Sequence, residues 1–307
     1  MPLPLSASGS AGRPACFISV DLEEWSDARL AGTADGAQPA SHARQRAGGV
    51  ELAGGVELAA DRLLEMLDAA CARATFFTLG RIARRYPELV RRIARRHEIA
   101  THGETHTDLR QLDARRFAEE IRASRGRLEA LSGRAVLGYR APNWSLGAVA
   151  SWALPVLEQE GVRYDSSLLP GGGFLFLPGS PRTPRQPHRL PDSSLWEFPP
   201  TVARLAGRSA PIAGGAFLRI LPERMLLRVL SAAVHRGETP HLHVHPWEVV
   251  PPPAGGGLSP LRRLLLFAGA GTVVGKLRSI LKLYRGTAVE DQWRQAELAG
   301  RPSRNAA

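Results

Sequence analysis

The chain has 307 residues, of which 44% are hydrophobic and 22% are charged. This composition is typical of a globular protein and excludes a collagen-like, wholly disordered or membrane-embedded chain. The net charge is +11, but 38 of the 40 cations are arginines spread through every segment, and no recognition motif accompanies them, so the charge alone does not indicate a nucleic-acid binder.

The N-terminal segment, residues 1–14, is expected to be disordered. It lacks the basic start and the continuous apolar stretch of a secretory signal. The most apolar stretch, Leu264 to Val274, is shorter than the roughly 20 residues that span a bilayer. We therefore expect a cytoplasmic protein without a transmembrane segment, either free or peripheral to the inner membrane, and the oligomeric state stays open. The two cysteines, Cys16 and Cys71, are expected to be reduced core residues.

Short apolar runs alternate with helical patterns along most of the chain. Strands are predicted at Cys16 to Leu22, Thr75 to Leu79, Glu98 to Thr101, Val136 to Arg140, Val162 to Tyr164 and His241 to His245. Helices are predicted at Ala59 to Ala72, Pro87 to Arg96, Arg115 to Leu131, Val149 to Gln159 and Glu223 to His235. The cation-rich run Arg81 to Arg96 has the apolar spacing of an amphipathic helix whose arginines face solvent. This alternation indicates an α/β fold with parallel strands, and the number of units favours a distorted (β/α) barrel over an open sheet.

Three segments interrupt the pattern. Residues 31–55 are rich in Gly and Ala and predict a mobile loop, and the Gly/Pro-rich insertion at 170–191 predicts an irregular surface loop. The Pro and Gly residues after Val249 mark the end of the barrel. We therefore predict a barrel over 15–250, a C-terminal helical appendage over 251–296 and a polar tail over 297–307.

Polar residues fall where the predicted strands end. They are Asp21, Glu23, Glu24, His102, Arg140, Asp165 and His245. In a barrel of parallel strands all the C-terminal ends lie at one face, where active sites are built. Residues distant in sequence are therefore expected to converge there.

The spacing of His102 and His106 allows both imidazoles to face one point if the segment turns after the strand. Two imidazoles and one carboxylate make a catalytic zinc-type site that leaves room for water. The alternative is a pair of surface histidines. The pattern is not the HExxH of zincin peptidases, because Gly103 rather than Glu follows the first His.

The carboxylates of the first strand favour a metal site at His102 and His106 over a pair of surface histidines. Asp21 and Glu23 are alternate residues and share one face of a strand, so one carboxylate can bind metal while the other stays free as a base. Arg140, at a strand end, is placed to make a charge-assisted contact with a carboxylate. His243 and His245 also share a strand face, and His243 is either a site residue or a packed core residue.

Seven motifs occur in a fixed order: SVDLEEW, ATFFTLG, HEIATHGETH, GYRAPNW, YDSSL, IAGGAFLRILP and HVHPWE. In this order they resemble the NodB-type polysaccharide deacetylases (carbohydrate esterase family 4), particularly the branch associated with exosortase and exopolysaccharide gene systems. The resemblance covers roughly Phe17 to Glu248, about three quarters of the chain. It implies a distorted (β/α) barrel that removes N-acetyl, or sometimes O-acetyl, groups from sugar polymers with a divalent metal.

The resemblance also implies the roles of individual residues. Asp21 is the general base, His102 and His106 bind the metal, and the metal carboxylate comes from Glu23 or Glu24. Arg140 orients Asp21, Asp165 supports that arginine, and His245 is the general acid. Glutamates stand where most relatives have a second aspartate, and we expect Glu23 to be the ligand because it shares a face with Asp21.

The same residues suit acetamide hydrolysis. A zinc-like ion, which we take as the expected cofactor, lowers the pKa of bound water to about 7. Asp21 then accepts the water's proton and His245 protonates the departing nitrogen. Four aromatic residues beside the motifs, Trp25, Tyr139, Trp144 and Trp247, are predicted to contact sugar rings, and the tryptophans equally suit closing the barrel end.

The leading hypothesis is thus a metal-dependent deacetylase whose partner is an N-acetylated glycan or glycan precursor. One alternative is an amidase of small molecules on the same barrel. Another is a non-catalytic glycan-binding protein, which requires the loss of a metal or acid position. A basic nucleic-acid binder is the remaining alternative, and we expect no nucleic-acid partner.

Overall fold

The computed structural model describes residues 12–27, 46–47, 50–51, 55–171, 183–205, 208–251 and 260–299. Four predicted segments lie partly or wholly outside these ranges: the disordered N-terminus over 1–14, the loop over 31–55, the Gly/Pro-rich insertion over 170–191 and the polar tail over 297–307.

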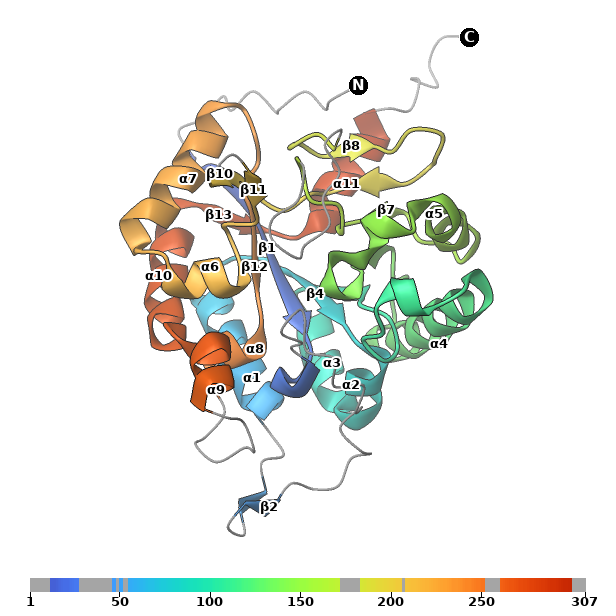
Figure 1. The fold of residues 1–307 in the computed structure, drawn as a ribbon, viewed down its shortest axis with the longest axis horizontal. Helices are drawn as coiled ribbons and strands as arrows, with labels where there is room; N and C mark the ends of the chain where they lie inside the picture. Colours follow the sequence, from blue (N-terminus) through green and yellow to red (C-terminus); the bar gives the residue numbers. More distant parts are fainter. Residues whose placement is uncertain are drawn as a thin grey trace.

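A curled sheet forms the centre of the molecule (Figure 1). Its strands are β1 (Ala15–Leu22), β4 (Thr75–Thr78), β5 (Glu98–Thr101), β6 (Gly138–Tyr139), β7 (Tyr164–Asp165), β8 (His188–Arg189), β9 (Trp196–Glu197), β12 (His241–Val244) and β13 (Arg285–Thr287). The order is β12-β1-β4-β5-β6-β7-β9-β8, with β13 also paired to β1. Every pairing is parallel except β8 with β9. This half-barrel confirms the predicted α/β fold with parallel strands.

Two short antiparallel hairpins lie outside this sheet, β2 (Arg46–Ala47) with β3 (Val50–Glu51) and β10 (Ala203–Leu205) with β11 (Arg208–Ala210). Helices surround the sheet (Figure 1). The α-helices are α1 (Gly55–Ala69), α2 (Gly80–Arg85), α3 (Pro87–Ala94), α4 (Ala114–Ser132), α5 (Ala150–Gln159), α6 (Gly215–Ile220), α7 (Glu223–His235), α8 (Pro246–Val249), α9 (Pro260–Phe267), α10 (Ala270–Leu283) and α11 (Val289–Ala299). The 3₁₀ segments are η1 (Trp25–Asp27), η2 (Leu109–Gln111) and η3 (Pro142–Ala148), the last of which is kinked at Asn143 and Trp144.

The alternation of side chains along β1 separates the hydrophobic core from the site. Ile18, Val20 and Leu22 point outward and belong to the main core, which packs under the helices. Ser19 and Asp21 occupy the alternate positions, and both are buried. β12 repeats the pattern in register, because Leu242 pairs with Ile18 while His243 pairs with Ser19. The inner face of the sheet is therefore polar toward the strand ends.

The structure corrects one helix. The run Arg81 to Arg96 was expected to be a single amphipathic helix, but it forms two helices, α2 and α3, that meet at Tyr86. Pro87 has no backbone N–H and disfavours helical geometry in the residue before it, so α2 ends before Tyr86. Pro87 is then the first residue of α3.

The C-terminal region contains α9, α10 and α11, and it also contributes β13, which pairs with the start of β1. One segment here, Arg263–Leu283, is long and apolar enough by length and composition to cross a membrane. In the fold it is divided between α9 and α10 at Gly269, which has a φ of +77°. Lys276, in the middle of α10, is buried and donates to the carbonyls of Leu218 and Arg219.

Candidate active site

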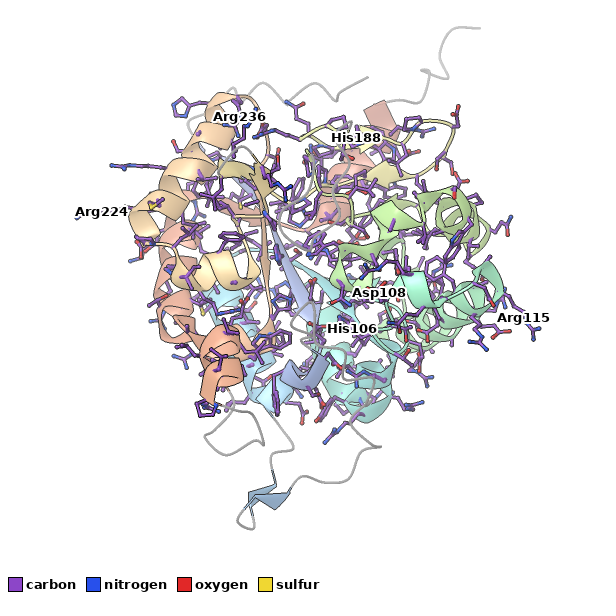
Figure 2. All side chains as sticks on the ribbon, viewed as in Figure 1. His106, Asp108, Arg115, His188, Arg224 and Arg236 are labelled. Atoms are coloured by element: carbon purple, nitrogen blue, oxygen red, sulfur yellow. The ribbon has the colours of Figure 1, made fainter. Side chains whose placement is uncertain are left out.

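Polar side chains gather at the C-terminal ends of β1, β5, β6 and β12. Figure 2 shows one of them, His106, near the end of β1. The structure brings together six of the predicted site residues here: Asp21, Glu23, His102, His106, Arg140 and His245. The convergence expected from parallel strand ends is therefore observed for these six.

Glu23, His102 and His106 form a buried cluster whose ligand atoms all lie within 4.8 Å of one another. The Glu23 Oε2 atom is 2.6 Å from His106 Nε2 and 3.6 Å from His102 Nε2. Glu24 is not part of the cluster, because its carboxylate accepts a hydrogen bond from Arg85 at 3.1 Å. β1 ends at Leu22, one residue before the glutamates, yet Glu23 still lies on the same side as Asp21.

The loop between the two histidines has an unusual backbone. Gly103 has a φ of +86° and His106 a φ of +60°, so two residues of this loop are in the left-handed region. Glu120 of α4 holds the loop: one of its carboxylate oxygens accepts from the backbone N–H groups of Glu104 and Thr105, and the other accepts from the Thr105 hydroxyl. The loop is therefore fixed from outside, and both imidazoles face Glu23.

The cluster suits a divalent metal. His102 Nδ1–H donates to the carbonyl oxygen of Arg140 at 2.7 Å, which leaves Nε2 as a lone-pair donor toward Glu23. This backbone partner is typical of metal-binding histidines. Glu23 Oε2 is buried without a hydrogen-bond partner, although the histidine nitrogens are close to it. Two imidazoles and one carboxylate are a donor set that zinc accepts while keeping an open position.

Asp21 and Arg140 form a buried ion pair beside the cluster. Arg140 Nη1 donates to Asp21 Oδ1 at 2.6 Å. Burial alone would raise the pKa of Asp21, but the charge of Arg140, with smaller contributions from His102 and His245, lowers that pKa to about 2. Asp21 is therefore ionised at neutral pH.

Every N–H group of the Arg140 guanidinium is used. Besides Asp21, it donates to the Ser19 hydroxyl, to the carbonyl and hydroxyl oxygens of Ser166, and to His241 Nε2. His241 is buried, and burial together with the charge of Arg140 holds its pKa well below the usual value, so it accepts as a neutral imidazole. These contacts fix the plane of the guanidinium.

The N–H groups of the Arg140 guanidinium are all taken by other acceptors, and Asp165 acts on the backbone beside Arg140 instead. Its carboxylate accepts from the backbone N–H and the hydroxyl of Ser167, and Ser167 Oγ in turn accepts from the backbone N–H of Ala141. Asp165 therefore supports the backbone that follows Arg140, rather than the guanidinium. Burial and the nearby Asp165 carboxylate raise the pKa of Glu197 well above its usual value.

His245 is on the opposite side of the cluster. Its Nε2 atom lies 3.8 Å from Asp21 Oδ2 and 3.7 Å from Glu23 Oε1. Its Nδ1–H donates to Glu248 Oε2 at 3.2 Å. Burial opposes protonation, but the hydrogen bond and charge of Glu248, with the charges of Glu23 and Asp21, raise the pKa of His245 to about 9. His245 is therefore protonated at neutral pH, with Nε2–H facing the other site residues.

His243 lies between His245 and Trp144, with ring centroids 5.9 Å and 5.2 Å away. Burial is the main cause that lowers its pKa to about 3, so it is neutral. A Cβ at residue 214 would lie 2.0 Å from the His243 ring, so Gly214 is required for this packing. His243 is therefore a packed residue that also borders the site.

The predicted aromatic contacts divide into two groups. Tyr139 is fully buried against Phe117, because it alternates with Arg140 and points to the outer face of the sheet, so its assignment to the substrate site is wrong. Trp247 is buried and stacks on the His245 ring at 4.5 Å, where it supports the histidine. Trp25 and Trp144 are only partly buried.

Four residues of the site were missed by sequence reasoning: Glu120, Arg219, His241 and Glu248. Glu248 had a local signal, since it lies three residues after His245 in a capping-box arrangement. Arg219 and Glu120 had none, because their partners are far away in the sequence.

Two family models match the chain. Residues 54–164 match the polysaccharide deacetylase model. Residues 166–294 match a domain of unknown function, DUF3473. Proteins of the first family are hydrolases that act on carbon–nitrogen bonds other than peptide bonds.

Solved structures share the fold. A protein from Mycobacterium smegmatis described as a polysaccharide deacetylase is similar to this chain with 22% identity and a TM-score of 0.61, over 99% of each chain. A CE4 family pseudoenzyme from Bacillus anthracis is similar with 11% identity and a TM-score of 0.50, over 92% of this chain and 66% of that chain. Since a pseudoenzyme shares the fold, the activity has to be argued from the side chains.

Proposed function

We propose that the chain is a metal-dependent hydrolase that removes acetyl groups, and N-acetyl groups in particular, from a polysaccharide or glycan precursor. The match of residues 54–164 to the polysaccharide deacetylase model supports this proposal. The observation that carries this proposal is that the Asp21–Arg140 pair, the Glu23–His102–His106 cluster and His245 meet at one place. Acetamide hydrolysis needs a proton acceptor for water, stabilisation of an oxyanion and a proton donor for the departing amine.

Asp21 is the proton acceptor. Arg140 holds Oδ1 and keeps the carboxylate ionised, while Oδ2 is directed toward His245. A water between Asp21 and the cluster can therefore lose its proton to Oδ2. The network around Arg140 keeps this carboxylate in place while the proton moves.

Glu23, His102 and His106 would hold the divalent metal, with zinc favoured by the two imidazoles. When bound, the ion supplies a Lewis acid that lowers the pKa of water and polarises the acetyl oxygen. The hydrogen bond from His102 to the Arg140 carbonyl couples the orientation of this ligand to the strand that carries Arg140.

His245 is the proton donor. Its Nδ1–H is engaged by Glu248, so the proton available for transfer is on Nε2, which faces Asp21 and Glu23. Protonation at neutral pH, which follows from the raised pKa, is the state that a general acid requires.

A glycan is the substrate class that the surroundings support. Trp25 and Trp144 are partly exposed near the site, and indole rings suit stacking on sugar rings. The order of the sequence motifs further supports an exopolysaccharide as the acetylated polymer.

The test is acetate release from N-acetylated and O-acetylated oligosaccharides. The full-length protein is stripped with a chelator and reloaded with zinc, cobalt, manganese or magnesium, and Asp21→Asn reloaded in the same way is the control. We expect release by the reloaded wild type, and release lowered roughly 10²- to 10⁴-fold in the reloaded variant. If the reloaded wild type keeps its metal and releases no acetate from either group of substrates, the proposal is wrong, and glycan binding without catalysis replaces it.

A further inference from the structure

The short helix α9 exposes its apolar side. Leu261, Leu264 and Leu265 lie on one face by their spacing, and they are 65%, 61% and 51% exposed. Leu266, on another face, is buried. A surface helix of a globular protein normally has the opposite arrangement, with its apolar face toward the core. The exposed leucines therefore need a physical explanation.

The position of α9 is fixed by residues that also build the site. The Arg219 guanidinium donates to the Leu265 carbonyl at 3.1 Å and to Glu248 at 2.7 Å, and Glu248 holds His245. Ile220, which follows Arg219 at the end of α6, is also 59% exposed, and α6 packs against α9. We call Ile220, Leu261, Leu264 and Leu265 the α9 patch.

Arginines of α2 lie across η1 from α9. Trp25 of η1 contacts Phe267 of α9 with ring centroids 6.5 Å apart, and the preceding residue, Glu24, accepts from Arg85 of α2. The side chains of Arg84 and Arg85 are 60% and 44% exposed, although Arg84 also pairs with Glu104 at 3.8 Å and Arg85 pairs with Glu24. In Figure 1, η1 lies between α9 and α2 at the end of β1 where the site is. An apolar patch and exposed arginines thus flank the site.

We propose that this face of the protein binds a lipid surface with anionic headgroups, with the α9 patch inserted among the acyl chains. A leucine face next to arginines is the chemistry of interfacial helices, whose binding grows with apolar area and with anionic lipid. The net charge of +11 favours the same partner.

A membrane span and a second copy of the chain both fit less well. The apolar segment Arg263–Leu283 bends at Gly269, and Lys276 is bonded inside the protein, so the segment lies on the domain. The α9 patch has only four side chains, whereas each partner in a standard protein interface contributes roughly 20–30 residues.

Vesicle co-sedimentation of the full chain tests the proposal without any activity assay, so its outcome is independent of the proposed function. The vesicles are phosphatidylcholine alone and phosphatidylcholine mixed with phosphatidylglycerol. The wild type should sediment with the mixed vesicles, less with pure phosphatidylcholine, and less as salt is raised. The triple variant Leu261→Gln/Leu264→Gln/Leu265→Gln should lower the partition coefficient at least about tenfold.

The matched control replaces three exposed leucines outside α9, in β10, α10 and α11, as Leu205→Gln/Leu283→Gln/Leu298→Gln, and should bind as the wild type does. Leu261→Trp, which adds an interfacial side chain, should strengthen binding. The proposal is overturned if the wild type stays in the supernatant with mixed vesicles, if the α9 variant binds normally, or if both triple variants lose binding equally. A concentration-dependent dimer lost only in the α9 variant, without vesicle binding, would show that a second copy covers the patch.

Discussion

Arg219 and Glu248 form a buried salt bridge, with Arg219 Nη1 donating to Glu248 Oε1 at 2.7 Å. The other carboxylate oxygen of Glu248 accepts from the backbone N–H of His245 at 2.9 Å and from its ring at 3.2 Å. Arg219 therefore holds the carboxylate that orients the proposed general acid. Both residues belong to the segment that matches the domain of unknown function, so part of the proposed chemistry resides there.

Glu248→Gln should lower the pKa of His245 from about 9 toward its ordinary value, because a charge and a hydrogen-bond acceptor for the imidazolium are lost. In the wild type the protonated ring contributes stability that is fully present below about pH 6.5 and is lost as the pH rises through about 9. NMR titration of the metal-free protein measures this pKa. Glu238→Gln, which breaks an exposed pair with Arg236, is the control. An unchanged His245 pKa in Glu248→Gln would contradict the assignment.

Asp21→Asn should preserve the fold and the metal content while lowering turnover roughly 10²- to 10⁴-fold, the ordinary contribution of a general base. Asn keeps the shape of the side chain but cannot accept the water's proton. Acetate release and metal analysis on the same sample make the test. Glu24→Gln neutralises a carboxylate that pairs with Arg85 outside the cluster and should leave turnover unchanged. Equal turnover in wild type and Asp21→Asn would place the base elsewhere.

His245→Ala should also keep the metal and lower turnover roughly 10²- to 10⁴-fold. Activity of the wild type should fall at high pH as His245 loses its proton, and the variant should lack this alkaline limb. The measurement is a pH–rate profile of acetate release. Retention of the same limb in His245→Ala would mean that another group donates the proton, and His243→Ala would be the next variant to measure.

Metal binding should depend on Glu23 and not on Glu24. His102→Ala, His106→Ala and Glu23→Gln each remove one member of the cluster and should lower zinc affinity, whereas Glu24→Gln should bind like the wild type. Isothermal titration of the chelator-treated protein gives the affinities and the stoichiometry. Tight binding by Glu23→Gln together with loss in Glu24→Gln would reverse the choice of ligand.

Glu98→Gln should stabilise the protein at alkaline pH. Burial and the charge of Glu290 raise the pKa of Glu98 to about 8, so the folded state holds a proton that the unfolded chain releases near pH 4.5. Its stability contribution is present below about pH 4.5 and is lost as the pH rises through about 8. The Tm difference between Glu98→Gln and wild type should therefore grow from pH 5 to pH 9. A constant difference would show that Glu98 is ionised throughout.

Much of the site could be predicted because it follows strand periodicity. Asp21 and Glu23 share a side, and the histidines follow the end of β5, so the pattern of residues at strand ends located the cluster. The same alternation places Tyr139 on the opposite face from Arg140, so strand periodicity also accounts for its burial.

Long-range hydrogen bonds could not be predicted. The resemblance implies that Asp165 supports Arg140, but the orientation of the guanidinium depends on Ser19, Ser166 and His241, which come from three different strands or their ends. Likewise the choice between Glu23 and Glu24 depended on where β1 ends and on Arg85 of a separate helix. Such partners are set by packing and leave no periodic signal in the sequence.

The strand β1 has partners from both matched segments. β4, from residues 54–164, pairs with the second half of β1. β12 and β13 both come from residues 166–294; β12 pairs with the middle of β1, and β13 pairs with its beginning. A protein cut between the two segments would leave β1 with open edges, which invite aggregation. The two segments therefore make one cooperative folding unit, and neither half is expected to be expressed, or exchanged between relatives, as an independent module.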